Sequence, residues 1–233
     1  MTPGDAGTGK RNAGERAAEF VRDGMVVGLG TGSTTYHFLV RLAERIKAEG
    51  LSVAGVPTSH QTAIRARELG IPLATLDDYP ALDLAVDGTD QVDPALRLIK
   101  GRGAALTREK VVAAAAARLV IVADREKVVP ALSGTVPLEV IPFAATPVIR
   151  SLREMGGVPV VREGKAKDGP VITDNGNYIV DCTFPAIPDP EGLEDALTLI
   201  PGVLECGLFC KFTGKTTLVS GSAGGVEVRG KPV

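Results

Sequence analysis

In the first half of the chain, short apolar runs alternate with longer stretches in which apolar residues recur at helical spacing. Met25–Gly28 is such a run, and the stretch Ser33–Glu49 follows it. Short apolar runs next to glycine are typical of buried strands, whereas a repeat of three to four residues is typical of an amphipathic helix. Ser33 is a suitable residue to begin that helix and Gly50 a suitable residue to end it. On its predicted apolar side lie Tyr36, Phe38, Leu39, Leu42 and Ile46.

The same alternation continues for about a hundred residues. Short apolar runs separated by helical stretches predict βαβ units, a mostly parallel sheet and a Rossmann-like α/β core. The further predicted strands are Leu51–Val56, Ile71–Leu73, Leu82–Val86 and Leu119–Ala123, and the further predicted helices are Ser59–Leu69 and Ala104–Arg118.

The order of elements changes after Pro130. It becomes strand, helix, strand, strand, helix, strand, which is the ferredoxin-like order. We therefore expect an α/β protein with an inserted ferredoxin-like α+β lid domain over residues 131–208, a core over 10–130 and 209–233, and a disordered lead-in over 1–9. Ligand is expected in the crevice at the carboxyl ends of the parallel strands. The elements of the second pattern are Val136–Ile141, Ala145–Met155, Val158–Arg162, Tyr178–Cys182, Glu191–Ile200 and Val203–Leu208, and the strands Thr217–Ser220 and Gly225–Val228 return to the first sheet.

Composition excludes several classes of function. The 233 residues have a net charge of −2, so no overall basic field attracts nucleic acid or an anionic membrane. The longest apolar stretch, Val111–Ala123, is interrupted by Arg118 and is too short to cross a bilayer. With no apolar signal-peptide region at its start, the chain is expected in the cytoplasm.

The three cysteines favour neither a disulfide framework nor a metal site. Cys182, Cys206 and Cys210 are odd in number, and the two histidines, His37 and His60, lie far upstream of them. A zinc site needs about four ligands. We interpret the thiols as buried filler and expect no metal.

A glycine-rich loop follows the first predicted strand, with the sequence GLGTGSTT over Gly28–Thr35. Backbone N–H groups at a helix N-terminus and several hydroxyls are suited to binding a phosphate. A dinucleotide fingerprint would need glycine where Ser33 stands, and a P-loop would need a lysine that the segment lacks. A monophosphate is therefore a better candidate ligand than a dinucleotide. The alternative interpretation is an ordinary βα turn without a ligand.

Four candidate catalytic residues, all of them charged, follow within two dozen positions. Asp87 and Asp90 come directly after the strand Leu82–Val86, in DGTDQVD, and Lys100 and Glu109 lie in KGRGAALTREK. A carboxylate can remove a proton next to a carbonyl, and an ammonium can neutralise the oxyanion that results. The alternatives are an Asx-type turn for the aspartates, a solvated lysine, and a solvated helix acid.

These segments, together with ADREK (123–127) and EVIPFA (139–144), resemble type A ribose-5-phosphate isomerases over about Lys10 to Val228. The resemblance implies a cofactor-free aldose–ketose isomerase of the non-oxidative pentose phosphate pathway. Such an enzyme interconverts D-ribose 5-phosphate and D-ribulose 5-phosphate. The resemblance also implies a homodimer or a dimer of dimers, with a small sugar phosphate as the partner rather than nucleic acid or membrane.

The resemblance also implies roles for single residues. Glu109 is the base that moves a proton between C2 and C1 through an enediolate, Asp87 and Asp90 handle ring opening and the sugar hydroxyls, and Lys100 faces the enediolate oxygen. Lys10 reaches the phosphate. The other implied substrate contacts are Thr31, Gly32, Ser33, Thr34, Gly88, Thr89, Gly101, Arg102, Gly103 and Lys127.

Three positions depart from the family pattern. Arg102 stands where glycine is frequent, so its backbone is not expected to need a positive φ. Thr89 replaces a usual alanine and Glu126 a usual serine, and neither change removes a catalytic group.

Two other classes of function would require features that differ from those of this sequence. A non-catalytic sugar-phosphate sensor would keep the glycine loop but would normally have a DNA-binding helix-turn-helix, for which there is no room before Lys10. An acyl-CoA transferase would need a nucleophilic glutamate in another context, and an amino-sugar-phosphate deaminase a catalytic histidine.

Overall fold

The computed structural model describes residues 3–166 and 168–232, which divide into two compact units. The core unit comprises Met1–Thr89, Arg108–Val128 and Phe212–Val233, and the small unit comprises Asp90–Thr107 and Val129–Lys211. Within the described residues, none of the helices is long and apolar enough to cross a membrane.

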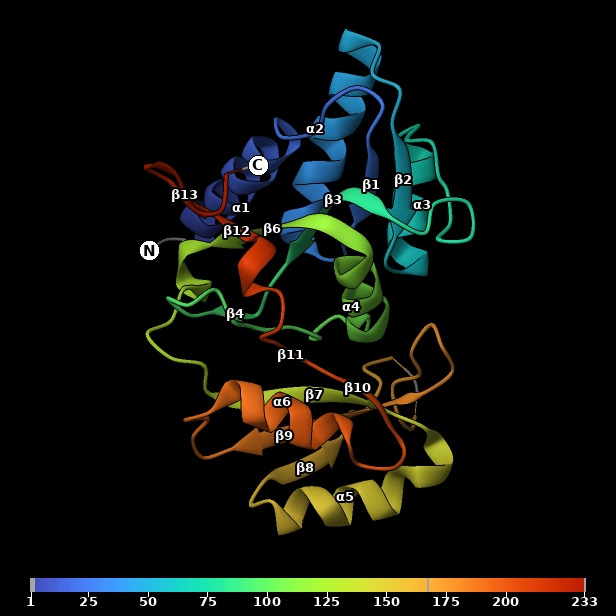
Figure 1. Ribbon diagram of the computed structural model, residues 1–233, viewed down its shortest axis with the longest axis vertical. Coiled ribbons are helices and arrows are strands. Elements are labelled where there is room, and N and C mark those ends of the chain that lie inside the picture. The colour runs from blue at the N-terminus through green and yellow to red at the C-terminus, as the bar shows by residue number, and fades with distance from the viewer. Residues whose placement is uncertain (1–2, 167, 233) are drawn as a thin grey trace. The chain divides into compact units, whose positions relative to one another are not determined.

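A six-stranded sheet forms the centre of the core unit, with the strand order β13-β12-β6-β3-β1-β2 (Figure 1). Its strands are parallel except β13, which pairs antiparallel with β12. β1 lies between β2 and β3, so the order of the strands reverses beside β1. Ligands of open parallel sheets bind at such a switch point, beyond the carboxyl ends of the strands. The strands are β1 (Val26–Leu29), β2 (Ala54–Pro57), β3 (Leu82–Gly88), β6 (Ala116–Asp124), β12 (Thr216–Ser222) and β13 (Gly225–Gly230).

Helices pack on both faces of this sheet. On one face, Val27 and Leu29 of β1 share a buried cluster with Phe38, Leu39 and Leu42. On the other face, β1 presents Gly28, and a Cβ there would lie 2.4 Å from Val112 Cγ1. The alternation of side chains along a strand explains why one residue faces each layer. The helices of the core unit are α1 (Pro3–Ala18), α2 (Ser33–Glu49), α3 (His60–Glu68) and α4 (Leu106–Ala115), the last beginning in the small unit.

The first helix is the largest departure from the predicted elements. We expected a disordered lead-in over residues 1–9, but α1 begins at Pro3; residues 1–2 lie outside the described ranges. The helix packs closely on α2, because a Cβ on Gly14 would lie 2.7 Å from Phe38 N. Asn12 Nδ2 also donates a hydrogen bond to Ser222 O over 2.9 Å. Its buried side consists of small residues, including Ala13 and Ala17, so the pattern contains no run of large apolar side chains.

The small unit has the predicted order of strands and helices. Its four-stranded sheet has the order β10-β7-β9-β8, and all neighbouring pairs are antiparallel. The β-α-β-β-α-β succession is therefore confirmed. The elements are β7 (Gly134–Val140), α5 (Ala145–Glu154), β8 (Val158–Val161), β9 (Tyr178–Phe184), α6 (Pro190–Thr198) and β10 (Val203–Cys206).

A second, three-stranded sheet in the small unit was not expected. The hairpin of β4 (Gln91–Val92) and β5 (Leu98–Ile99) pairs through β5 with β11 (Leu208–Phe209). We had placed residues 90–107 in the core domain. Pairing with a strand more than a hundred residues later groups them with the small unit instead.

Smaller differences concern where elements end. Ile71–Leu73 does not form a strand and contributes a single parallel bridge, between Gly55 and Leu73. The helix predicted to reach Arg118 ends at Ala115, and β6 begins at Ala116. In the part of the chain that the structure describes there are also three short 3₁₀ helices: η1 (Arg125–Lys127), η2 (Pro142–Ala144) and η3 (Thr213–Lys215).

Candidate active site

The glycine loop joins β1 to α2 at the switch point of the sheet. Gly30 N donates to Val86 O of β3 over 2.9 Å, and Gly32 is the residue that precedes the helix, with φ 136°. Among the described residues, no side chain caps this end of α2, and no acid lies in its first turn. A helix of 17 residues with an uncapped N-terminus is suited to an anion such as phosphate.

A chain of hydroxyl groups holds this loop from beneath. Thr31 Oγ1 lies 2.8 Å from Thr58 Oγ1 and donates to Ser59 Oγ over 2.8 Å. Ser59 donates to Thr62 Oγ1 over 3.1 Å, and Thr62 donates to Gly30 O over 3.0 Å. Each hydroxyl can donate one hydrogen bond and accept two, so the hydroxyls can form a continuous chain. The last donor of this chain, Thr62, binds the carbonyl of Gly30 in the glycine loop itself. The geometry gives the Thr31 side chain an anchoring role in the loop.

Asp87 connects the glycine loop with the end of β3. Its Oδ1 accepts from Thr31 N over 3.2 Å and from Gly88 N over 2.7 Å, and the side chain is buried. A Cβ on Gly30 would lie 2.3 Å from Asp87 Oδ1, so only glycine fits there. One carboxylate oxygen therefore has the turn-forming role that was the alternative interpretation of this aspartate.

Burial lowers the pKa of His37 on α2, and the charges of Arg11 and Lys10 lower it further, whereas Glu15 raises it. Lys10 itself lies in α1 and is partly buried. Its role near a phosphate stays a prediction.

Glu109 lies in the first turn of α4 and is buried, with 5% of its surface exposed. A solvated helix acid was the alternative interpretation of Glu109, and its burial removes that alternative. At the carboxyl end of the neighbouring strand β6, Asp124 is also buried. Its Oδ1 has no hydrogen-bond partner among the described residues.

Lys100 is as deeply buried as Glu109 and belongs to the small unit. Its side chain is 3% exposed, its backbone N donates to Gly207 O over 2.8 Å, and its Nζ lies 5.4 Å from the ring centre of Phe209. A buried ammonium is costly in a merely structural position. A solvated lysine is therefore excluded.

Asp90 and the loop after Lys100 are joined by their backbones. Asp90 N donates to Ile99 O over 2.8 Å, and Asp90 Oδ2 accepts from Arg102 N over 3.0 Å. Gly101 has a φ of 111°, whereas Arg102, as predicted, does not have a positive φ. The Arg102 side chain is exposed.

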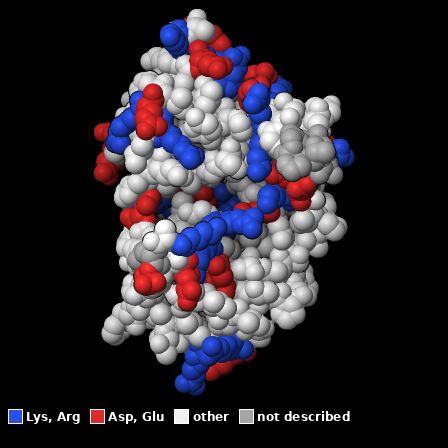
Figure 2. Space-filling view, turned by 180° about the vertical axis from the view of Figure 1, so that it is seen from behind, with Lys and Arg blue, Asp and Glu red and all other residues white. Residues whose placement is uncertain are grey.

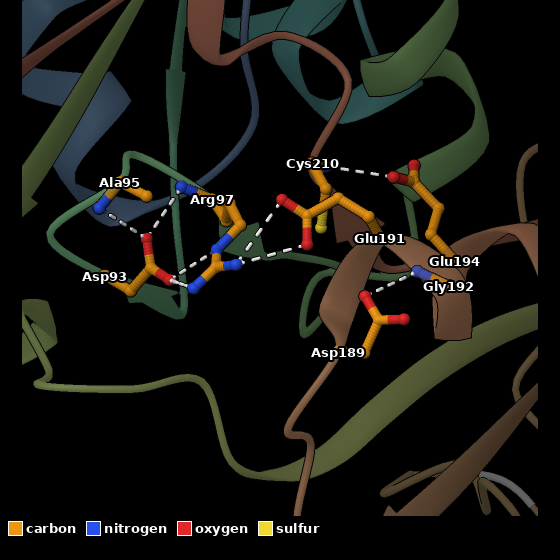
Figure 3. Close-up of polar contacts among 8 residues, drawn as sticks. All are labelled: Asp93, Ala95, Arg97, Asp189, Glu191, Gly192, Glu194 and Cys210. Atoms are coloured by element: carbon orange, nitrogen blue, oxygen red, sulfur yellow. Dashed lines mark hydrogen bonds and ion pairs between the residues drawn. The ribbon is translucent and has the colours of Figure 1, made fainter.

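Figure 3 shows the polar network that holds the β4–β5 hairpin, whose two ends are Asp90 and Lys100. Asp93 is fully buried, and its Oδ1 accepts from Ala95 N and Arg97 N over 2.9 and 3.0 Å. Arg97 Nε donates to Asp93 Oδ2 over 2.6 Å, and Arg97 Nη1 pairs with Glu191 of α6 over 3.1 Å. The hairpin is thereby tied to a helix about ninety residues later.

The predicted site residues fall into two groups. The structure brings together Thr31 and Asp87 in the core unit, and Asp90 and Arg102 in the small unit. The core unit contains Lys10, Thr31, Gly32, Ser33, Thr34, Asp87, Gly88, Thr89, Glu109 and Lys127; the small unit contains Asp90, Lys100, Gly101, Arg102 and Gly103.

Sequence reasoning missed the hydroxyl residues Thr58, Ser59 and Thr62. The run TSHQT directly after a strand was the available signal, because that position is the same sheet edge as the glycine loop.

The three cysteines are buried free thiols, as predicted, and burial raises the pKa of Cys182 to about 11. Figure 2 shows acidic and basic side chains interspersed over the visible face, in agreement with the net charge of −2.

The core unit is therefore a Rossmann-like α/β fold with a glycine loop suited to an anion at its switch point. Residues 54–224 match the family model of ribose 5-phosphate isomerase A, also called phosphoriboisomerase A. The chain is 60% identical to the ribose-5-phosphate isomerase A of Methanoregula boonei, over 91% of this chain and 90% of that protein. It is 53% identical to that of Methanosarcina acetivorans, over 86% of each.

Solved structures show the same similarity. The ribose 5-phosphate isomerase A of Methanocaldococcus jannaschii superimposes with a TM-score of 0.90 at 44% identity, covering 95% of this chain and 98% of that one. A D-ribose-5-phosphate isomerase in complex with phospho-erythronic acid gives 0.91 at 45% identity, covering 95% and 97%. This chain belongs to the ribose 5-phosphate isomerase A family, whose members are aldose–ketose isomerases.

Proposed function

We propose that this chain converts D-ribose 5-phosphate to D-ribulose 5-phosphate with Glu109 as the base, through an enediolate. The observation that supports this assignment most directly is the burial of the Glu109 carboxylate at the start of α4. A buried, positioned carboxylate is a suitable group for moving a proton next to a carbonyl. The related enzyme solved with phospho-erythronic acid adds support, because that ligand has a phosphate and a planar, anionic end that resembles an enediolate.

The phosphate binds at the N-terminus of α2 in this proposal. The uncapped amides after Gly32, the Ser33 and Thr34 hydroxyls and the Lys10 ammonium would share its charge. The phosphate does not react, so its binding energy can be used to orient the carbons that do.

Two protons move in the chemical step, one from C2 to C1 through Glu109 and one from O2 to O1. Glu109 takes the proton from C2 of the open-chain aldose, the C2–H electrons form the C1–C2 double bond, and negative charge collects on O1. Lys100 neutralises that oxygen. The protonated Glu109 then returns the proton to C1, while the O2 proton passes to O1 and C2 becomes the ketone carbon.

Asp87 and Asp90 act before and around this step. A furanose must open before C2 becomes acidic, and opening requires a proton transfer between the ring oxygen and the C1 hydroxyl. Asp87, whose Oδ1 already accepts two backbone amides, is fixed well enough to orient such a hydroxyl. Asp90 would bind a further sugar hydroxyl, and Gly88, Thr89, Gly101, Gly103 and Lys127 would complete the substrate contacts.

The test is formation of ribulose 5-phosphate by the purified chain in excess EDTA, with Glu109→Gln beside it and Glu44→Gln, an exposed acid on α2, as the matched control. We expect kcat to fall about 10³-fold in Glu109→Gln, with substrate binding within about tenfold of the parent, since the role of the base is confined to the transition state. Glu44→Gln should behave as the parent does. Equal loss of binding and turnover in Glu109→Gln would contradict the assignment.

If the chain is instead a sugar-phosphate sensor, the same assay should show no turnover by the parent together with tight binding of ribose 5-phosphate.

We also propose a cytoplasmic location and a homodimer or a dimer of dimers, supported by the family resemblance. Light scattering on the purified chain measures the assembly.

A further inference from the structure

The loop that follows Lys100 has a strained backbone. Gly101 has a φ of 111°, and Ala104, which has a Cβ, has a φ of 59°. A non-glycine residue in the left-handed region costs about 1–2 kcal/mol and persists only where surrounding contacts define it. A Cβ on Gly101 would lie 2.8 Å from Leu106 Cδ2, so the loop is also tightly packed.

Arg162 provides two of the contacts that define this loop, beside the hydrogen bond from Ala104 N to Gly101 O over 3.0 Å. Its guanidinium Nη1 donates to Gly101 O over 3.1 Å and to Arg102 O over 3.0 Å. The other edge of the guanidinium forms a two-bond pair with Asp181 of β9, with Nε–Oδ2 and Nη2–Oδ1 distances of 2.7 and 2.5 Å. Backbone hydrogen bonds to Ile179 and Val171 hold Arg162 in register just beyond β8. All of these residues belong to the small unit.

The peptide group between Gly101 and Arg102 is held from both of its edges. Its carbonyl accepts from Arg162, and its N–H donates to Asp90 Oδ2 over 3.0 Å. A trans peptide directs these two groups to opposite sides. Turning the peptide over would aim the carbonyl at a carboxylate and the N–H at a guanidinium. The charges of Arg162 and Asp90 therefore favour one orientation of the peptide group between Gly101 and Arg102.

We propose that Arg162, oriented by Asp181, is a positioning residue of the isomerase reaction. It sets the conformation of the loop that follows Lys100 and contains Arg102, and it orients Asp90 through the shared peptide. A planar guanidinium is needed, because one ammonium cannot pair in a two-bond manner with Asp181 and also bind two carbonyls. The inference rests on the proposed function.

The test compares Arg162→Ala and Arg162→Lys with Arg150→Ala, which removes an exposed arginine of α5 that pairs only with Glu154 among the described residues. We expect kcat of Arg162→Ala to fall about 100-fold and KM to rise by a clearly smaller factor, because the displaced loop both positions the reacting groups and contacts the substrate. Arg162→Lys should recover a minor part of the loss. Arg150→Ala should match the parent.

Chemical rescue separates positioning from a loss of folding. Guanidinium at non-denaturing millimolar concentration should raise kcat of Arg162→Ala several-fold, whereas sodium at equal ionic strength should not, and neither should change Arg150→Ala. An active parent with a fully active Arg162→Ala would overturn the inference and leave the proposed function intact. An inactive parent would instead overturn the proposed function.

If Arg162→Ala does not fold, the inference is tested on Arg162→Lys instead. Amide hydrogen exchange at Arg102 and Gly103 should be faster in Arg162→Lys than in the parent, with exchange in β7 unchanged. Unchanged exchange at these two amides would overturn the inference.

Discussion

Two loops that contain candidate site residues are held in place by different kinds of interaction. The glycine loop of the core unit is held by backbone hydrogen bonds, by the neutral hydroxyls of Thr31, Ser59 and Thr62, and by one buried carboxylate, that of Asp87. The loop after Lys100 in the small unit is held by charged groups, Arg162 and Asp90. Neutral, short-range contacts respond little to salt, whereas partly exposed charged contacts weaken as salt rises.

The elements that supply the partners differ as well. The partners of Thr31 lie beside strands of the parallel sheet that neighbour β1, the hydroxyls about thirty residues away and Asp87 56 residues away, whereas Arg162 lies just beyond a strand of the ferredoxin-like sheet. A phosphate-binding turn can therefore be formed by neighbouring βα units. The second loop needs strands of the ferredoxin-like sheet before its conformation is defined.

The largest effect is expected where the glycine loop and Asp87 touch. Gly30→Ala would place a Cβ 2.6 Å from Asp87 Cα, which is backbone and cannot move aside. We expect kcat/KM to fall about 100-fold and the free energy of unfolding to fall by about 1–3 kcal/mol, measured by assay and urea titration. Gly7→Ala, where a Cβ meets nothing within 4 Å, is the control. A Gly30→Ala variant with parental kcat/KM would show that this contact is not needed.

A smaller effect, on stability, is expected from the network in Figure 3. Arg97→Met leaves the fully buried Asp93 without its cation, although two backbone amides still donate to it. We expect the free energy of unfolding to fall by about 2 kcal/mol. Arg150→Met removes an exposed pair on the same unit and should change it by less than about 0.5 kcal/mol. Equal urea midpoints for the two variants would contradict the expectation that the buried ion pair contributes more to stability than the exposed one.

The smallest effect is expected from the hydroxyl chain. Thr62→Val keeps the shape of the side chain but removes the donor to Gly30 O. We expect a loss of about 1 kcal/mol in stability and a several-fold rise in KM with kcat nearly unchanged. The rise should be the same at about 0.05 and 0.5 M salt, because the lost contact is neutral. Thr198→Val, which removes a hydroxyl within α6, should leave KM unchanged, and a salt-dependent rise in Thr62→Val would contradict the comparison.

The elements that could be predicted have strong local patterns. The helix predicted over Ser33–Glu49 matches α2 at both ends, because Gly50 adopts the left-handed conformation that ends a helix. The order of elements after Pro130 could also be predicted, since each strand and helix has a clear periodicity. By contrast, α1 was missed because its buried side consists of alanine and glycine, which no apolar pattern distinguishes from a flexible segment.

The sequence was sufficient to predict which residues belong to the candidate site. It was not sufficient to predict which of them lie in the core unit and which in the small unit. Asp87 and the glycine loop follow neighbouring parallel strands, so their meeting at one sheet edge follows from topology. The grouping of Asp90 and Lys100 with the small unit does not, because it depends on the two-residue pairing of β5 with β11. Strands that short leave no recognisable period in a sequence.

The sequence by itself determined the class of fold, the family, and which residues have the chemistry that isomerisation requires. Residue types and their spacing are local properties, and a base, a cation and a phosphate-binding turn can be recognised one at a time. The tertiary structure alone decided that Glu109 and Lys100 are buried, that Thr31 anchors its loop, and that Arg162 contacts the residues after Lys100. These facts depend on side chains from distant segments meeting in space, and no local pattern records such meetings.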